Sequence, residues 1–503
     1  MRYIEIMDTT LRDGEQTSGV SFSASEKLAL AQLLLTDVRV DRIEIASARV
    51  SDGELLAVQK ITEWAKNNGH LEKIEVLTFV DGQESINWML QSGAKVMNLL
   101  TKGSLNHLTH QLKKTPAAHF ADVAAVIAAA QQAGISCNVY LEDWSNGMRQ
   151  SPEYVFEFLD FLATQPVRRV LLPDTLGVLT PSESYTFVKT VVDKYPSQHF
   201  DFHAHNDYDL GTANVMQALR AGAHGLHLTV NGMGERAGNA PLASAIAVMK
   251  DFMPDLETGV AEASLYMVSK IVETFSGLRI PANKPIVGDN VFTQTAGIHA
   301  DGDKKNNLYF SKLMPERFGR KRVYALGKTS GKANIENNLR DLGIKLSDDD
   351  LRKVTQRVIE LGDKKEVVTP EDLPYIISDV LDTNAIEARI EVLNYVLTHS
   401  KDLKPSATLK VRIDEAVFEE NAQGDGQYDA FMNALKKIYE ANHKTLPTLT
   451  DYAVRIPTGG RTDALCETII TWDWRGSDLK TRGLDSDQTV SAIKATQKML
   501  NLL

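Results

Sequence analysis

The first half of the chain alternates two patterns of apolar and polar residues. Short apolar runs of strand length are followed by longer stretches whose apolar residues recur three and four positions apart, as on one face of a helix. The apolar runs lie at residues 3–7, 42–46, 73–80, 95–100, 135–141, 168–172, 199–203 and 224–230. The helical stretches between them include residues 24–35, 53–67, 120–133, 152–164 and 213–221.

Strands that alternate with helices run parallel, and eight is the number that closes a (β/α)8 TIM barrel. The alternative is a doubly wound sheet of six or seven strands. Polar side chains favour the barrel because they gather where the predicted strands end, as barrel active sites do. These residues are Asp13, Asn98, Thr101, Lys102, Glu142, Asp174, Thr175, His203, His205 and those of segment 231–239.

The alternation stops near residue 258, and the rest of the chain shows two further patterns. Residues 259–387 are mainly helical in pattern and predict a linker region. Residues 388–503 repeat the order strand, strand, strand, helix twice, which predicts an α+β module. We therefore expect a catalytic barrel over residues 1–258, helical linker subdomains over 259–387 and a regulatory domain over 388–503.

Composition narrows the class of protein. A hydrophobic content of 43% and a charged content of 24% are ordinary for a soluble globular chain, and the net charge of −11 argues against nucleic-acid or anionic-membrane binding. The two cysteines, Cys137 and Cys466, are far apart, so a reducing cytoplasm is expected. Acids at Glu5 and Asp8 argue against a signal peptide, and the uncharged run 123–141 is better explained by an alanine-rich helix and a strand than by a membrane span.

Two histidines suggest a metal site. His203 and His205 lie two positions apart on a predicted strand, so both side chains point to one face. Asp13 follows the first strand and can reach them at the mouth of a closed barrel. Imidazoles beside a carboxylate bind divalent metals, so we predict a site formed by these three residues, with the amide oxygen of Asn239 as a fourth ligand. A hydrogen-bonded histidine pair is the alternative.

Other polar residues are candidates for chemistry. Arg12 supplies a planar cation for a carboxylate or a developing oxyanion, unless it forms a surface salt bridge. Glu142 ends the fifth strand and can serve as acid, base or orienting group, or pair with a neighbouring loop. His299 and Tyr309 lie outside the barrel, so they contribute only if their segment folds back over a barrel mouth, either that of the same chain or that of another subunit.

With these residues assembled, the chain resembles the isopropylmalate, homocitrate and citramalate synthases. Two signatures carry the resemblance: "LRDGEQTSG" (11–19), and the element that runs from "HAHND" (203–207) to "NGMGERAGN" (231–239). The likeness covers the whole chain. Stretches such as "NVYLEDWSNG" (138–147) and "VFTQTAGIHADG" (291–302) are most similar to the citramalate branch.

The resemblance implies a metal-dependent acyltransferase. Acetyl-CoA would condense with pyruvate, and hydrolysis of the thioester would release citramalate and CoA, a step in isoleucine and leucine biosynthesis. A divalent zinc, manganese or magnesium ion would bind the oxo acid. Arg12 and Thr175 would hold its carboxylate and the developing alkoxide, and Leu77, Leu100 and Tyr140 would enclose its methyl group.

The base that takes a proton from the acetyl methyl group is left open by the resemblance. Glu142 and His299 are both candidates, with Tyr309 assisting. The sequence alone does not separate the two.

The C-terminal module resembles the leucine- or isoleucine-sensing domain of the same family, which pairs across a homodimer. The resemblance therefore implies feedback inhibition by one of these amino acids. The pocket would be lined by Tyr428, Asp429, Leu449, Tyr452, Ile456 and Cys466. The apolar members of this set fit equally well as core residues of a small α+β domain.

Three alternatives remain for the function. A 2-isopropylmalate synthase would use the same chemistry on 2-oxoisovalerate. A carbon–carbon lyase would run cleavage on a similar metal barrel, although the effector-like module argues against it. A non-catalytic amino-acid sensor would not need the polar residues of the barrel.

Overall fold

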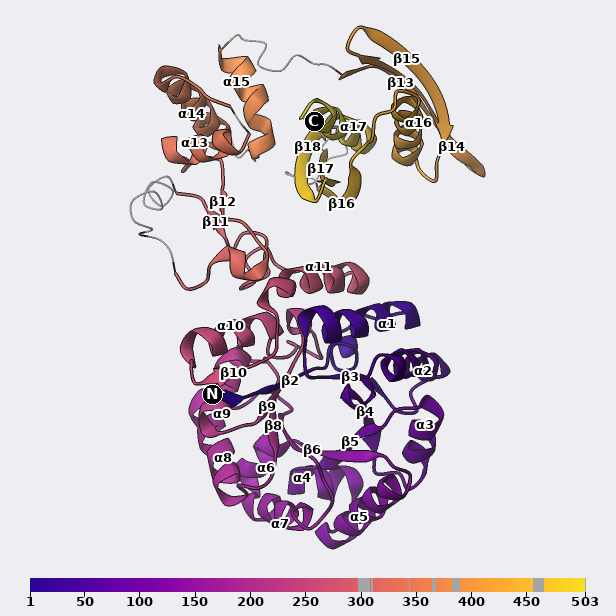
Figure 1. Ribbon diagram of the computed structural model, residues 1–503, viewed down its shortest axis with the longest axis vertical. Helices are drawn as coiled ribbons and strands as arrows, with labels where there is room; N and C mark the ends of the chain where they lie inside the picture. The colour runs from indigo at the N-terminus through magenta and orange to yellow at the C-terminus, as the bar shows by residue number, and fades with distance from the viewer. Residues whose placement is uncertain are drawn as a thin grey trace. The chain divides into compact units, whose positions relative to one another are not determined.

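The fold is described by a computed structural model, which covers residues 1–296, 308, 311–342, 344–363, 368–381, 390–455 and 466–502 (Figure 1). The chain divides into two compact units. The first is formed by residues 1–292 and 310–322, and the second by residues 293–309 and 323–503. All barrel residues belong to the first unit.

Eight parallel strands form a closed barrel in the first unit, so the predicted (β/α)8 barrel is confirmed and the doubly wound sheet is wrong. Neighbouring strands pair in the order of the sequence, and the last pairs with the first. The strands are β2 (Glu5–Asp8), β3 (Arg42–Ser47), β4 (Ile74–Phe79), β5 (Val96–Lys102), β6 (Ser136–Glu142), β7 (Val170–Asp174), β8 (Phe200–Ala204) and β9 (Gly225–Leu228). Outside the barrel, β1 (Arg2–Tyr3) pairs with β10 (Leu256–Glu257).

Helices form a ring around the strands (Figure 1). The helices of the first unit are α1 (Ala24–Leu33), α2 (Asp52–Asn67), α3 (Glu84–Ser92), α4 (Leu105–His107), α5 (Pro116–Gln132), α6 (Trp144–Gln150), α7 (Pro152–Leu162), α8 (Pro181–Lys194), α9 (Gly211–Ala221), α10 (Leu242–Phe252) and α11 (Leu265–Ser276), of which α11 lies outside the ring. Local sequence fixes where several of them begin. Ser23 caps α1 in a reciprocal pair with Glu26, and Thr180 caps α8 in the same way with Glu183.

The main apolar core lies between the strands and this ring of helices. Ile6, Ile43 and Phe202 of the strands are fully buried in it, together with Leu30 and Phe158 of the helices. Since every strand has one face against the helices, the other face is directed into the barrel. That alternation is what delivers polar side chains to the barrel interior and its mouth.

The interior of the barrel is unusually polar, because barrels of this class are mostly filled by branched apolar side chains. Its buried polar residues include Arg42, Glu44, Glu75, Asn98, Asn138, Asp201 and His227. Buried charges require partners, and here they have them. Arg42 donates hydrogen bonds to Glu75 at 2.9 Å and to Asp201 at 2.5 Å.

The second unit contains a helical part and an α+β part. The helical part follows the short strand pair β11 (Thr293–Gln294) and β12 (Val323–Tyr324), and its helices α13 (Lys332–Asp341), α14 (Asp348–Asp363) and α15 (Leu373–Leu381) share a separate apolar cluster. The α+β part consists of β13 (Ile390–Ser400), β14 (Leu403–Ile413), β15 (Ala416–Gln423), α16 (Gln427–Ala441), β16 (Thr448–Arg455), β17 (Cys466–Trp474), β18 (Ser477–Asp485) and α17 (Gln488–Leu502).

This order confirms the predicted double repeat of three strands and a helix. Each set of strands forms a three-stranded antiparallel sheet. The domain bounds expected from the sequence stay a prediction. Among the described residues, no helix is both long enough and apolar enough to cross a bilayer.

Candidate active site

The loop after β2 brings Arg12 and Asp13 to the barrel mouth. A 3₁₀ turn over Gly14–Gln16 follows them, and Thr17 fastens it by bonding to the Gly234 backbone in the neighbouring loop. Gly234 has a φ of +148°, and a Cβ there would lie 2.2 Å from Asn239 Nδ2 and 3.1 Å from Asp13 Oδ1. Only glycine therefore lets the two loops approach this closely.

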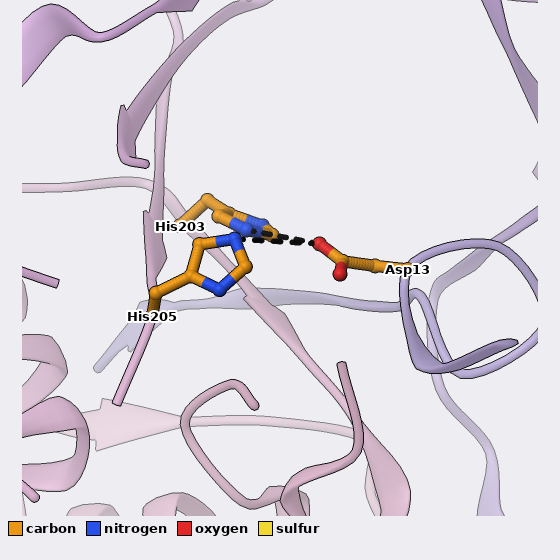
Figure 2. Close-up of side chains that lie close together, drawn as sticks. All are labelled: Asp13, His203 and His205. Carbon is orange, nitrogen blue, oxygen red and sulfur yellow. Dashed lines mark ion pairs between the residues drawn. The ribbon is translucent and has the colours of Figure 1, made fainter. Parts of the chain in front are cut away.

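Asp13, His203 and His205 converge, as Figure 2 shows. Asp13 Oδ2 lies 3.3 Å from His203 Nε2 and 3.7 Å from His205 Nε2. All three residues are buried, and their candidate ligand atoms lie within 4.8 Å of one another. Asn239 forms an isolated β-bridge with His205, and its amide oxygen is buried without a hydrogen-bond partner in the described residues.

Burial and neighbouring charges set the protonation states of this cluster so that it can bind a cation. Burial alone would raise the pKa of Asp13, but the charge of Arg12 and a hydrogen bond from His203 outweigh it and hold the pKa below its usual value. Burial, and then the charge of His203, lower the pKa of His205 to about 4. Near neutral pH the cluster thus offers an ionised carboxylate and a neutral imidazole, the forms that bind a metal. Two nitrogen and two oxygen donors suit zinc, manganese or a similar divalent ion.

Arg12 is fixed in place and directed at the same cluster. Its Nε donates to the buried Glu44 at 2.6 Å, and its Nη1 lies 3.4 Å from Asp13 Oδ2. The guanidinium carbon lies 5.9 Å from the centre of the Tyr140 ring. Within the described residues, no hydrogen bond involves Nη2, so this nitrogen is available to an anion. Arg12 is therefore not the surface salt bridge that was the alternative.

One cavity of about 170 Å³ brings most of the predicted residues together. Its apolar wall belongs to a small cluster in which Leu77 and Tyr140 are buried with Leu171, and Leu100 packs against them. The cavity is lined by Arg12, Asp13, Gln16, Leu77, Leu100, Tyr140, Glu142, Pro173, Thr175, His203, His205 and Glu235.

Glu142 reaches this cavity from the end of β6. Its carboxylate forms an ion pair with Lys102, which stands beside it at the end of β5. The backbone of Lys102 is held by Tyr154, whose hydroxyl donates to its carbonyl at 2.7 Å. Glu142 keeps 23% of its side chain exposed, so a substrate can reach it.

Thr175 lies across the cavity, after β7. Its hydroxyl oxygen accepts the backbone N–H of Asp143 at 2.9 Å, which leaves the hydroxyl proton available for a ligand. Arg236 donates to the Thr175 carbonyl at 2.8 Å and pairs with Asp207. The loop that carries Asn239 is thereby tied to the end of β7.

Three predicted residues, His299, Tyr309 and Ile456, lie outside the described residues. Their roles stay predictions.

The predicted effector residues of the second unit are only partly brought together. Tyr428 of α16 and Tyr452 of β16 have ring centres 5.4 Å apart. Asp429 is exposed, and its carboxylate accepts the backbone N–H of Asp425 at 2.9 Å, so it braces its own helix start. Leu449 lies on β16, and Cys466 is a buried residue that begins β17.

Some residues around the site were not identified as functional from the sequence. Glu44 holds Arg12, Lys102 holds Glu142, and His227 bonds to Tyr140 with 2.9 Å between Nδ1 and the hydroxyl oxygen. Glu44 and His227 lie inside predicted strands, where alternation alone does not tell which face is inward. Lys102 ends a strand beside the site, and its position at the strand end is the feature of the sequence that indicates a functional role.

Residues 3–272, which make up more than half of the chain, match the HMGL-like family. The chain belongs to the HMGL-like family. In this HMGL-like chain, residues 286–366 match the homocitrate synthase post-HMGL domain-like family, and residues 367–503 match the LeuA allosteric (dimerisation) domain.

Full-length relatives agree with these matches. A candidate (R)-citramalate synthase of Methanopyrus kandleri is 34% identical over 92% of this chain and 88% of its own length. The (R)-citramalate synthase of Methanocaldococcus jannaschii is 32% identical over 99% of both chains. The 2-isopropylmalate synthase of the same organism is 31% identical over 99% of this chain and 94% of its own. The predicted resemblance to this group of HMGL-like transferases is confirmed.

Proposed function

We propose that this chain condenses acetyl-CoA with pyruvate to form citramalate and CoA. The cavity at the barrel mouth is the observation that supports this most strongly. It combines a candidate metal cluster and the Arg12 guanidinium with an apolar wall, and its volume of about 170 Å³ is small. Pockets for drug-sized ligands measure roughly 300–1,000 Å³. A short oxo acid with one polar end matches such a site.

Different side chains have different roles in the proposed reaction. Arg12 Nη2 and the Thr175 hydroxyl would bind the oxo-acid carboxylate. Asp13, His203, His205 and Asn239 would hold a divalent ion, which supplies Lewis-acid polarisation of the oxo-acid carbonyl.

A base removes a proton from the acetyl methyl group, and the resulting carbanion forms the new carbon–carbon bond at that carbonyl carbon. Glu142 is one candidate base, since it lines the cavity, and His299 is the other. The alkoxide that forms takes up a proton. Water then cleaves the thioester, and CoA leaves as its thiol.

A second hollow supports acetyl-CoA as the other substrate. It measures about 290 Å³ and lies against the 231–238 loop, which also borders the first cavity through Glu235. Arg236, Arg279 and Lys284 line it, beside apolar residues that include Met233 and Leu278. A cationic, partly apolar hollow is suited to a ligand with phosphate groups on an organic chain.

The test is release of CoA thiol from acetyl-CoA with pyruvate or 2-oxoisovalerate, each with and without EDTA. We expect pyruvate to be preferred and EDTA to abolish turnover, with recovery when manganese or zinc is restored. Full turnover after exhaustive chelation would contradict the metal site. Absence of thiol release with either acid would contradict the condensation itself.

The second candidate substrate is 2-oxoisovalerate, because a 2-isopropylmalate synthase is almost as similar to this chain as a citramalate synthase is. The buried wall of Leu77 and Tyr140 argues against it. A branched acid adds two methyl groups, and each methylene that does not fit costs about 1–3 kcal/mol of discrimination. A higher kcat/KM for 2-oxoisovalerate would keep the reaction class and overturn this interpretation of the wall.

We further propose that the chain acts as a homodimer inhibited by isoleucine or leucine through residues 388–503. The match to an allosteric dimerisation domain and the Tyr428–Tyr452 pair support this. Titrating each amino acid into the thiol-release assay should lower turnover for one of them. Replacing Tyr452 with alanine should remove the inhibition and leave the uninhibited rate unchanged. Flat activity with both amino acids would contradict feedback.

A further inference from the structure

The barrel interior contains a continuous chain of polar contacts that begins at Arg12. Arg12 donates to Glu44, and the other oxygen of Glu44 accepts from Asn98 at 2.7 Å. Asn98 accepts in turn from Asn138 at 2.8 Å, and the same amide group lies 3.2 Å from Glu75. Apart from Arg12, which lies in the loop after β2, these residues come from the four strands β3 to β6, so the series of contacts crosses much of the barrel.

The same series of polar contacts continues through the barrel and returns to the substrate cavity at Tyr140. Glu75 accepts from Arg42 at 2.9 Å, and Arg42 also donates to Asp201 at 2.5 Å. Asp201 Oδ2 lies 3.1 Å from His227 Nε2, and His227 Nδ1 lies 2.9 Å from the hydroxyl of Tyr140. Because the Arg12 guanidinium lies 5.9 Å from the Tyr140 ring, the contacts form a closed circuit.

The contacts themselves set the direction of the last bonds. Asp201 Oδ2 already accepts a hydrogen bond from Arg42 at 2.5 Å, so it also accepts from His227 Nε2 at 3.1 Å. Because the Nε2 hydrogen of His227 is directed at Asp201, its Nδ1 is left to accept the hydroxyl proton of Tyr140 at 2.9 Å.

Tyr140 lines the cavity, whereas the residue that holds its hydroxyl, His227, is fully buried and is not part of the cavity lining. The Tyr140 ring belongs to the cluster with Leu77, Leu100 and Leu171 that forms the apolar wall. It also lies edge-on to His203, with ring centres 6.2 Å apart and an interplanar angle of 88°. A hydrogen bond to the hydroxyl of Tyr140 restricts the position of its ring and therefore the position of the apolar wall that the ring forms.

We propose that His227 is a positioning residue that sets the size limit of the oxo-acid pocket by holding the hydroxyl of Tyr140. This inference rests on the proposed condensation of an oxo acid. Loss of the hydrogen bond frees the ring to shift, so a longer acid such as 2-oxobutanoate is accommodated more easily. Among the described residues, no hydrogen bond joins His227 to Arg12 or to the metal cluster, but its ring lies edge-on to that of His203 with ring centres 5.6 Å apart. We therefore expect the chemical step to be retained in the variants that keep their metal.

The experiment compares kcat/KM for pyruvate and for 2-oxobutanoate in wild type, His227→Leu, Tyr140→Phe and the double variant. One buried hydrogen bond corresponds to roughly a fivefold change, so each single variant should lower the pyruvate preference about fivefold. The double variant should show no further loss, because both changes remove one bond. The KM for acetyl-CoA should stay as in wild type.

Two further variants act as controls. His227→Asn keeps an amide group near the Nδ1 position and should restore most of the preference. His199 bonds to Asp201 through the other carboxylate oxygen, Oδ1, at 2.9 Å. Among the described residues, no hydrogen bond joins His199 to the pocket wall, so His199→Leu should leave the preference unchanged. Thermal unfolding and bound metal are measured for every variant to identify misfolded protein.

Additive losses in the double variant, or an equal loss in His199→Leu, would show a general effect on the barrel and overturn the inference. A loss of kcat in Tyr140→Phe beyond a hundredfold would also overturn it, since the hydroxyl would then act on the substrate. If wild type turns over neither acid, the proposed function fails. If wild type is active and His227→Leu keeps the preference, only the positioning role fails.

Discussion

Replacing Asp13 with asparagine is expected to remove bound metal and to lower turnover by about a hundredfold to a thousandfold. Asp13 is the one acidic member of the cluster, and its oxygen faces both histidine Nε2 atoms. An amide would supply no charge to balance a divalent ion, and polarisation of a carbonyl by such an ion is worth several kcal/mol. Metal content after gel filtration and thiol release measure the two effects.

Asp8 provides a matched control on the same strand end. Its carboxylate is also buried, and burial raises its pKa to about 7, so near neutral pH it is already partly uncharged. Its Oδ1 accepts the Thr10 N–H at 2.9 Å, a bond that an asparagine oxygen can keep. Asp8→Asn should therefore retain metal and most activity. Wild-type metal content in Asp13→Asn would contradict the assigned ligand set.

Replacing Glu142 with glutamine is expected to lower kcat by about 10²- to 10⁴-fold, the usual contribution of a general base. The variant keeps the shape of the side chain and can still contact Lys102, but it cannot take a proton. Pyruvate binding should change little, because the carboxylate of the acid is held by Arg12 and Thr175. The direct measurement is incorporation of solvent deuterium into the acetyl methyl group with oxamate bound in place of pyruvate.

Comparison variants make this result decisive. Glu235 lines the same cavity and pairs with Arg236 at 3.4 Å, so Glu235→Gln changes a nearby charge without removing the candidate base. It should exchange deuterium at a near wild-type rate. If Glu142→Gln still exchanges and His299→Gln does not, the base is His299 and Glu142 has an orienting role.

The sequence was informative about the barrel because parallel strands leave two independent signals. Each strand appears as an apolar run, and polar residues collect after its carboxyl end, as at Asp13, Glu142 and Thr175. Each of the eight apolar runs overlaps a barrel strand. The pair His203 and His205 carried its own signal, since a spacing of two on a strand means one face.

The polar interior could not be inferred in the same way. In "RIEIAS" and "KIEVLTF" the acids Glu44 and Glu75 alternate with isoleucine or valine, a pattern equally typical of a strand with one face in water. Only closure of the barrel shows that these acids are sealed inside. Partners such as Arg42 with Asp201 are 159 residues apart, and no local pattern connects them.

The closed circuit in the barrel also has a consequence for how the chain folds. Arg42 and Glu75 come from the first four strands, whereas Asp201 and His227 come from the last four. A collapsed half-barrel would bury Asp201 without its arginine, and an uncompensated buried charge costs several kcal/mol. We therefore expect half-barrel intermediates to be disfavoured and the eight strands to fold cooperatively.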